Sequence, residues 1–212
     1  MNKIVARFLI AGILATGGVR SQTVNCLVAV VGNQAITLVD LRVAQEFGLF
    51  DRDSGGASIS DPAAVLEALI GQKLVAAMAR EPGTTAKGEV DRAVAELRSK
   101  LGPDAFAAKL AKFGLKEADL RPYLEERLRY ERVVSARFIA PVALSRGDVE
   151  KYYRDVYAPG ERAKGREPAA LESVLASLEA RVRAELRARK VVEWVRTIRS
   201  QADVRINRDC LK

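Results

Sequence analysis

The feature that most constrains the fold is an uninterrupted helical pattern over residues 169–201. Apolar side chains recur there every three or four positions, which places them on one face of an α-helix. The other face is rich in Arg and Glu, as expected for a face in water. The apolar face consists of Leu171, Val174, Leu175, Leu178, Val182, Leu186, Val191, Trp194 and Ile198. This last long helix predicts a mostly α-helical protein.

Shorter helical patterns precede it, and each ends at a turn signal. They cover about 38–47, 62–80, 86–101, 104–112, 117–138 and 145–157. Asp61 is expected to cap the second of these helices, with Pro62 in the first helical position. The wide apolar face of this second helix predicts a central packing element. A Gly-, Ser- and Asp-rich loop over residues 48–60 separates it from the first helix.

Two of these helices begin at variants of the capping box. Thr37 stands three residues before Asp40, and Ser145 stands three residues before Asp148. In such a pair the first side chain accepts a hydrogen bond from a backbone N–H of the helix, and the second side chain accepts one from the backbone N–H of the first residue. Pro122 lies within the first two turns of the 117–138 pattern, so we expect a kink there.

The first residues resemble a secretory leader. Lys3 and Arg7 precede an apolar run over residues 8–15, which is much shorter than the roughly 20 residues of a spanning helix. Small residues follow, and cleavage after Gly17 or after Ser21 stays open. The alternatives are an uncut anchor helix or a buried first helix. We expect export, and no membrane span once the leader is removed.

Short strands are predicted near both ends of the remaining chain. Residues 27–31 are apolar and β-branched, Gly32-Asn33 is a turn signal, and Ala35-Ile36 can return as a second strand. Residues 203–207 alternate in polarity and predict a terminal strand. The two ends of an exported chain can therefore pair in one small sheet.

The two cysteines, Cys26 and Cys210, lie next to these terminal strands. An antiparallel register that places Val30 opposite Ile206 also places the cysteines opposite each other. Because disulfides form in exported proteins, we expect one bridge between them. Two unrelated thiols are the alternative. No CxxC motif is present, which excludes a metal knuckle or a thioredoxin-type redox site.

The chain contains no histidine. This removes the commonest metal ligand and the usual general base near neutral pH. Gly55-Gly56 is not followed by the Lys-Ser/Thr of a phosphate-binding loop. We therefore expect no enzymatic activity, no catalytic or metal-binding residues and no cofactor.

Five segments follow one another along the chain: VAVVGNQAITLVDL (28–41), LIGQKLVAAMARE (69–81), GLKEADLRPYLEERLRYERVV (114–134), LSRGDVEKYYRDVY (144–157) and RKVVEWVRTIRSQADVRI (189–206). In this order they resemble the SurA-type periplasmic chaperones and related parvulin-linked foldases. The resemblance covers residues 27–207. It implies a periplasmic location and a multi-helix chaperone lobe, whose small β element combines the N-terminal hairpin with the C-terminal strand.

The chain departs from this family between Tyr157 and Leu171, where the family carries one or two isomerase domains. Parvulin sites also depend on histidine, so the resemblance implies no prolyl isomerase activity. The expected organisation is a signal peptide (1–21), an N-terminal peptide-binding lobe (22–157), a polar linker in place of the isomerase (158–168) and a C-terminal helix and strand that complete the lobe (169–212).

The resemblance implies ATP-independent binding of unfolded or nascent exported polypeptides, outer-membrane proteins among them, through an apolar groove. Apolar contact suits this task because it is non-directional and tolerates many sequences. Aromatic residues are the candidates for such a groove, and core packing is the alternative for each of them. They are Phe106, Phe113, Tyr123, Tyr130, Phe138, Tyr152 and Tyr153.

Three other functions compete with this interpretation. A nucleic-acid or membrane-surface binder would use the cations of residues 181–199, but Glu179, Glu185 and Glu193 interleave with them and favour a solvated face without a nucleic-acid partner. A paired-carboxylate enzyme would use the acids of residues 125–131, where an i,i+4 ion pair between Glu125 and Arg129 is the simpler expectation.

The third alternative is a structural or partner-dedicated envelope module that uses the same fold without general chaperone activity. A homodimer also stays open, because a terminal strand that completes a distant lobe can do so in a second copy.

The basic side chains considered for the nucleic-acid or membrane-surface function are Arg181, Arg183, Arg187, Arg189, Lys190, Arg196 and Arg199, and the acids considered for the enzyme are Glu125, Glu126 and Glu131.

Overall fold

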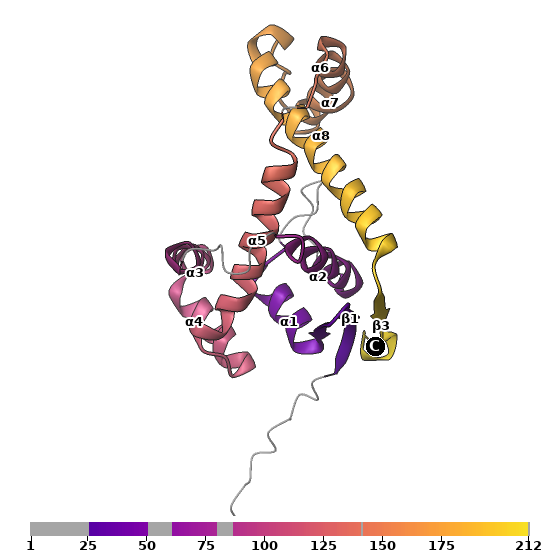
Figure 1. Ribbon diagram of the computed structural model, residues 1–212. Helices are drawn as coiled ribbons and strands as arrows, with labels where there is room; N and C mark the ends of the chain where they lie inside the picture. The colour runs from indigo at the N-terminus through magenta and orange to yellow at the C-terminus, as the bar shows by residue number, and fades with distance from the viewer. Residues whose placement is uncertain (1–25, 51–60, 80–86, 141, 212) are drawn as a thin grey trace, which may run out of the picture.

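The computed structural model describes residues 26–50, 61–79, 87–140 and 142–211. It confirms the predicted fold class, a mostly α-helical protein with one small antiparallel sheet. Figure 1 shows a broad lower part, the body, which holds the sheet and α1–α5, and a narrower upper part, the head, which holds α6, α7 and the start of α8. The predicted leader and most of the 48–60 loop lie outside the described residues.

The sheet joins the two ends of the described chain. Its strands are β1 (Leu27–Val31), β2 (Gln34–Thr37) and β3 (Val204–Ile206), in the order β2-β1-β3 with both pairs antiparallel. Gly32, with a φ of 58°, takes the first position of the β1–β2 turn, in the left-handed region that favours glycine. The predicted pairing of the N-terminal and C-terminal strands is confirmed.

A disulfide joins Cys26 to Cys210, with 5.9 Å between their Cα atoms, as predicted. The register behind that prediction is wrong by one residue, because Ala29 and not Val30 lies opposite Ile206. Cys210 does not lie on the strand. It lies in a 3₁₀ turn, η3 (Arg208–Leu211), so its position does not follow the strand register.

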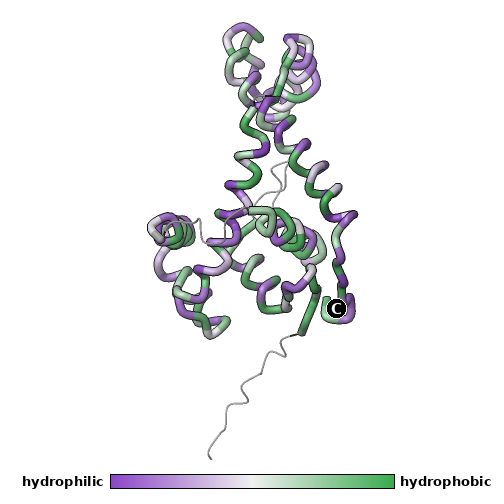
Figure 2. Tube along the Cα trace, viewed as in Figure 1, coloured by the Kyte–Doolittle hydropathy of each residue, from purple (hydrophilic) through white to green (hydrophobic). Residues whose placement is uncertain are grey.

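The body is built around α2 (Pro62–Ala76), which is buried along most of its length between α1 (Leu38–Glu46), α5 (Arg121–Arg137) and α8. Figure 2 shows hydrophobic residues along β1 and α2, inside this part of the molecule. As predicted, Asp61 caps α2 and accepts bonds from the N–H groups of Ala63 and Ala64. The helix packs centrally, as its apolar pattern predicted.

The remaining helices of the body are α3 (Lys87–Leu101) and α4 (Pro103–Phe113), followed by a 3₁₀ turn, η1 (Glu117–Leu120). Gly114 ends α4 with a φ of 64°, a helix end that glycine adopts without strain. The single helix expected over residues 117–138 is divided just before Pro122, where η1 ends and α5 begins. Because α5 begins only at Arg121, Pro122 falls in its first turn, where no backbone N–H is needed.

Helical structure in the head extends beyond Tyr157, where the sequence predicted that it ends. Helix α6 (Arg146–Tyr152) begins at the expected Ser145 capping box, and a π-helical turn (Tyr153–Tyr157) joins it directly to α7 (Ala158–Ala163). The first part of the expected polar linker is therefore helical. The wider π turn precedes Pro159, whose ring would clash with the carbonyl four residues earlier in a regular α-helix.

Helix α8 (Leu171–Gln201) runs from the head down to β3, along one side of the body (Figure 1). In the head, α8 packs against α6, where Leu178 and Val182 of α8 and Val149 of α6 are buried outside the core cluster of the body. In the body it crosses α2 very closely. A Cβ atom at Gly71 would lie 2.8 Å from Val195 Cγ1.

Candidate functional site

The structure does not bring the seven predicted aromatic residues into one groove. Phe106 is only 3% exposed and packs edge-on against Phe47, with 6.0 Å between the ring centroids. It is part of the body core. Tyr123 and Tyr130 are half-buried on α5, and burial raises the pKa of the Tyr130 hydroxyl. The Tyr123 hydroxyl donates to Asp40 Oδ1 at 2.6 Å and joins α5 to the start of α1.

The other predicted aromatics lie at the top of α5 and in the head. Phe138 packs edge-on against Trp194 of α8, with 5.6 Å between the ring centroids. The Tyr152 hydroxyl donates to Glu185 Oε1 at 2.8 Å, and the Tyr153 hydroxyl donates to the Ala169 carbonyl at 2.9 Å. Both tyrosines therefore link parts of the head to each other.

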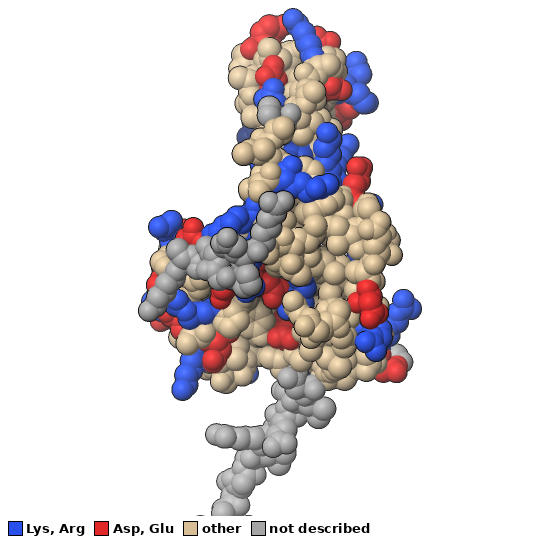
Figure 3. Space-filling model, in the orientation of Figure 1, with Lys and Arg blue, Asp and Glu red and all other residues tan. Residues whose placement is uncertain are grey.

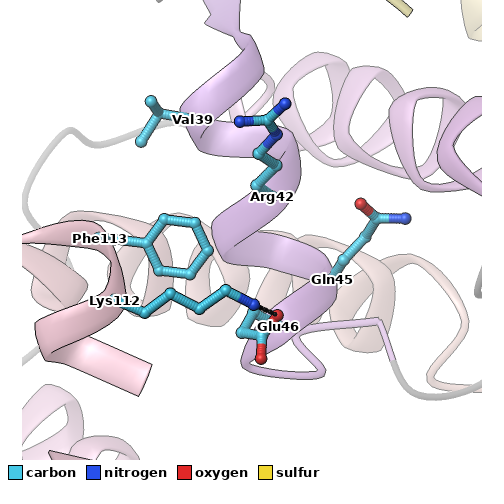
Figure 4. Close-up of a pocket in the computed structure, with 6 residues that line it drawn as sticks. All are labelled: Val39, Arg42, Gln45, Glu46, Lys112 and Phe113. Atoms are coloured by element: carbon cyan, nitrogen blue, oxygen red, sulfur yellow. Dashed lines mark hydrogen bonds and ion pairs between the residues drawn. The ribbon is translucent and has the colours of Figure 1, made fainter. Parts of the chain in front are cut away.

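Phe113, the last of the seven, lines a pocket on the surface of the body. This pocket lies between α1 and α4 and has a volume of about 420 Å³. Figure 4 shows the Phe113 ring beside α1, with Val39 and Arg42 further up that helix. The complete lining, which we call the α1–α4 pocket, is Val39, Arg42, Gln45, Glu46, Lys112 and Phe113.

The local sequence explains how α1 supplies one wall of the pocket. The Thr37 hydroxyl caps the Asp40 N–H, and the Asp40 carboxylate accepts from the Thr37 N–H at 2.7 Å, which begins the helix at Leu38. Val39 and Arg42 are three positions apart and lie on the same side of the helix. The opposite side of α1, with Leu41 and Ala44, is buried in the body core.

Three charged side chains hold α4 against the end of α1. Lys109 Nζ donates to the Glu46 carbonyl at 2.8 Å and to its carboxylate at 3.0 Å, and Lys112 Nζ donates to the same carboxylate at 2.9 Å. These bonds from Lys112 and Lys109 lower the pKa of Glu46. Since the cations outnumber the single carboxylate, and Arg42 adds another, the pocket carries a net positive charge.

A second, smaller pocket of about 200 Å³ lies where α3 faces α5. Its walls combine the apolar Ala93, Leu97, Leu124 and Leu128 with Gly48, Glu96, Lys100, Arg127 and Glu131. Arg127 and Glu131 are paired across one helical turn at 2.8 Å. This pocket contains no aromatic side chain.

The carboxylates considered for an enzyme are each paired with a cation. Glu126 binds Lys73 of α2 at 2.9 Å, and Glu131 binds Arg127. The predicted i,i+4 pair between Glu125 and Arg129 is present at 3.6 Å. These three acids thus serve as partners of neighbouring cations on α2 and α5.

Sequence reasoning singled out Phe113 but missed the rest of the α1–α4 pocket. The available signal was the spacing of Val39, Arg42 and Gln45 along the polar side of the first helix. Among the described residues, no group of three or more acidic or cysteine side chains is arranged to hold a metal ion. No helix within the described ranges is long and apolar enough to cross a bilayer.

No protein-family model matches the chain, and no curated protein matches it significantly.

Proposed function

We propose that this protein is a periplasmic, chaperone-like binder of unfolded exported polypeptides that uses no ATP and lacks prolyl isomerase activity. The observation that carries the proposal is the α1–α4 pocket, where an aromatic ring and a branched aliphatic side chain lie beside polar and charged side chains. The resemblance of the sequence segments to SurA-type chaperones supports the same function.

The pocket has the chemistry that loose recognition of many sequences requires. Phe113 and Val39 offer apolar contact, which depends little on direction. Arg42, Gln45 and Lys112 surround these two side chains with hydrogen-bonding groups. A volume of about 420 Å³ suits one or two side chains of an extended polypeptide and not a folded surface.

The proposed location rests on the leader-like sequence of residues 1–21 and on the disulfide. A bridge between Cys26 and Cys210 is typical of compartments outside the reducing cytosol. Export also places the protein where its proposed clients, unfolded envelope polypeptides, are found.

The experiment that tests the proposal is suppression of aggregation. An unfolded outer-membrane protein is diluted from denaturant with the mature chain, and light scattering is followed without ATP. We expect the scattering to fall as the chain approaches a several-fold excess. No suppression at that excess would favour a partner-dedicated envelope module. A proline-isomerisation assay of the same preparation should show no catalysis, and measurable catalysis would refute that part of the proposal.

A further inference from the structure

One basic surface of the molecule remains outside the proposed polypeptide site. It lies where the end of α5 meets the middle of α8, between body and head. We call it the junction surface and define it by Arg137 and Ile139 after α5 and by Arg187, Lys190 and Trp194 on α8. We propose that the junction surface binds the anionic headgroups of a lipid bilayer, with Ile139 entering the interfacial layer.

The α8 part of this surface is basic on one face. Arg187, Lys190 and Trp194 follow each other at spacings of three and four residues, which aligns them along the helix. Arg187 and Lys190 are exposed, as is Arg137. Figure 3 shows Lys and Arg side chains gathered at the junction of body and head on the face in view.

Two of the three acids that interleave with the cations of α8 interact elsewhere. Glu179 pairs with Arg183 at 3.7 Å, and Glu185 accepts the Tyr152 hydroxyl on the side of the helix that faces the head. Glu193 lies three residues after Lys190 and is therefore its neighbour on the helix surface, but it is about 100° away from Trp194. Within the described part of the chain, no carboxylate forms an ion pair with Arg137, Arg187 or Lys190.

Apolar groups lie next to these cations. The Arg137 guanidinium stacks over the Trp194 ring, 4.8 Å from its centroid, and Phe138 packs against the same ring. Ile139 is 83% exposed, the highest value among the large hydrophobic side chains of the described residues. Ile139 follows directly after Phe138, and an exposed aliphatic side chain close in the chain to a cation and a ring that pack on an indole is a combination that favours a membrane interface.

A lipid surface explains this combination better than a nucleic acid does. Cations alone would suffice for phosphates in a duplex backbone, where an exposed Ile139 has no partner. At a bilayer the same side chain can leave water while the cations stay among the headgroups. The inference does not depend on the proposed polypeptide binding, since the α1–α4 pocket belongs to the body.

Trp194 is the only tryptophan of the chain, so intrinsic fluorescence reports directly on the junction surface. The mature chain, without the leader, is mixed at low ionic strength with vesicles of phosphatidylglycerol or of phosphatidylcholine. We expect co-sedimentation with the anionic vesicles, a blue shift of the Trp194 emission, and loss of both with added salt. The zwitterionic vesicles should give neither signal.

Two surface variants separate the contributions of charge and apolar contact. The double variant Arg187→Glu/Lys190→Glu should lose binding to anionic vesicles by at least about tenfold. Ile139→Ser should lose about fivefold at unchanged salt dependence, because it removes only apolar contact. Arg92→Glu on α3 is the control for a charge reversal at an exposed position outside the junction, and it should bind as the wild type does.

Three results would overturn the inference. They are absence of binding to anionic vesicles, equal binding to both kinds of vesicle, and wild-type binding by the double variant with its helical circular dichroism intact. A shift of double-stranded DNA at physiological salt, without vesicle binding, would assign the surface to nucleic acid instead.

Discussion

Asp40 links a local sequence signal to a distant contact. Its Oδ2 atom closes the Thr37 capping box, and its Oδ1 atom accepts the Tyr123 hydroxyl at 2.6 Å. The capping box could be read from the sequence because both partners lie within one helical turn. The tyrosine could not be assigned in the same way, because it lies on α5, 83 positions along the chain.

The substitution Tyr123→Phe removes this hydrogen bond and leaves the ring. Because the acceptor is charged, we expect the free energy of unfolding at neutral pH to fall by about 1.5–3 kcal/mol. Urea unfolding followed by circular dichroism measures the change. An unchanged midpoint would show that the bond does not stabilise the fold.

The same variant tests a pH dependence. Burial, and then the bond to Asp40, raise the pKa of the Tyr123 hydroxyl above its ordinary value of 10.0. The unfolded chain therefore loses this proton first, and the stabilisation, complete below pH 10, is lost as the pH rises further. Urea unfolding above pH 10 should show a steeper loss in the wild type than in Tyr123→Phe. Tyr130 and Tyr152, whose pKa values are also raised, remain in both proteins and contribute equally. An equal loss of stability in the two proteins would therefore contradict the role of Tyr123.

At the scale of elements, the crossing of α2 and α8 joins the last helix to the body. It depends on a glycine, since a Cβ atom at Gly71 would meet the stiff, β-branched Val195 at 2.8 Å. Gly71 is buried in the middle of α2, where glycine otherwise disfavours a helix. Its small size is therefore what the packing of this pair of helices requires.

The substitution Gly71→Ala should lower the free energy of unfolding by about 1–3 kcal/mol, because it overpacks the crossing. Gly88→Ala on α3 is the matched control, because a Cβ atom there meets nothing within 4 Å. It should leave stability unchanged or raise it by up to about 1 kcal/mol. The double variant Gly71→Ala/Val195→Ala should recover part of the loss, and equal stability of the single variant and wild type would contradict the close crossing.

Two elements, α7 and η3, could not be predicted from the sequence patterns. Ala158-Pro159-Gly160 carries two residues typical of turns, yet these residues lie in α7. The preceding π turn accommodates Pro159, and no periodicity in the sequence signals such a turn. Similarly, Cys210 indicated the correct disulfide partner but the wrong strand register, because the chain turns into η3 after β3.

At the scale of the whole molecule, the disulfide closes the chain on itself. Cys26 and Cys210 are separated by 184 positions, and they bind the end that follows α8 and β3 to the first strand. The proposed binding site is harder to predict from the sequence than this closure of the chain. Phe113 could be proposed as an aromatic candidate, but its neighbours on α1 come from a segment more than 60 residues earlier, and periodicity describes each helix only by itself.

Reduction of the disulfide should destabilise the whole molecule. In the chain-entropy account, opening so long a loop lowers the free energy of unfolding by about 5 kcal/mol. Thermal unfolding with and without reductant measures this, and hydrogen exchange should increase first at β3. The variant Cys26→Ser/Cys210→Ser should be as stable as the reduced protein, and its stability should not change when reductant is added. A reduced wild type as stable as the oxidised one would contradict the predicted contribution.

The central claim, that the α1–α4 pocket holds unfolded polypeptides, is tested most directly by site-specific photocrosslinking. A photoreactive amino acid replaces Arg42 in the pocket or, as a control, the exposed Arg92 on α3. Each protein is irradiated with a labelled, unfolded outer-membrane polypeptide. We predict a crosslinked adduct from position 42 that an excess of unlabelled unfolded polypeptide abolishes, and little adduct from position 92. No adduct from position 42, or equal adducts from both positions, would contradict the claim.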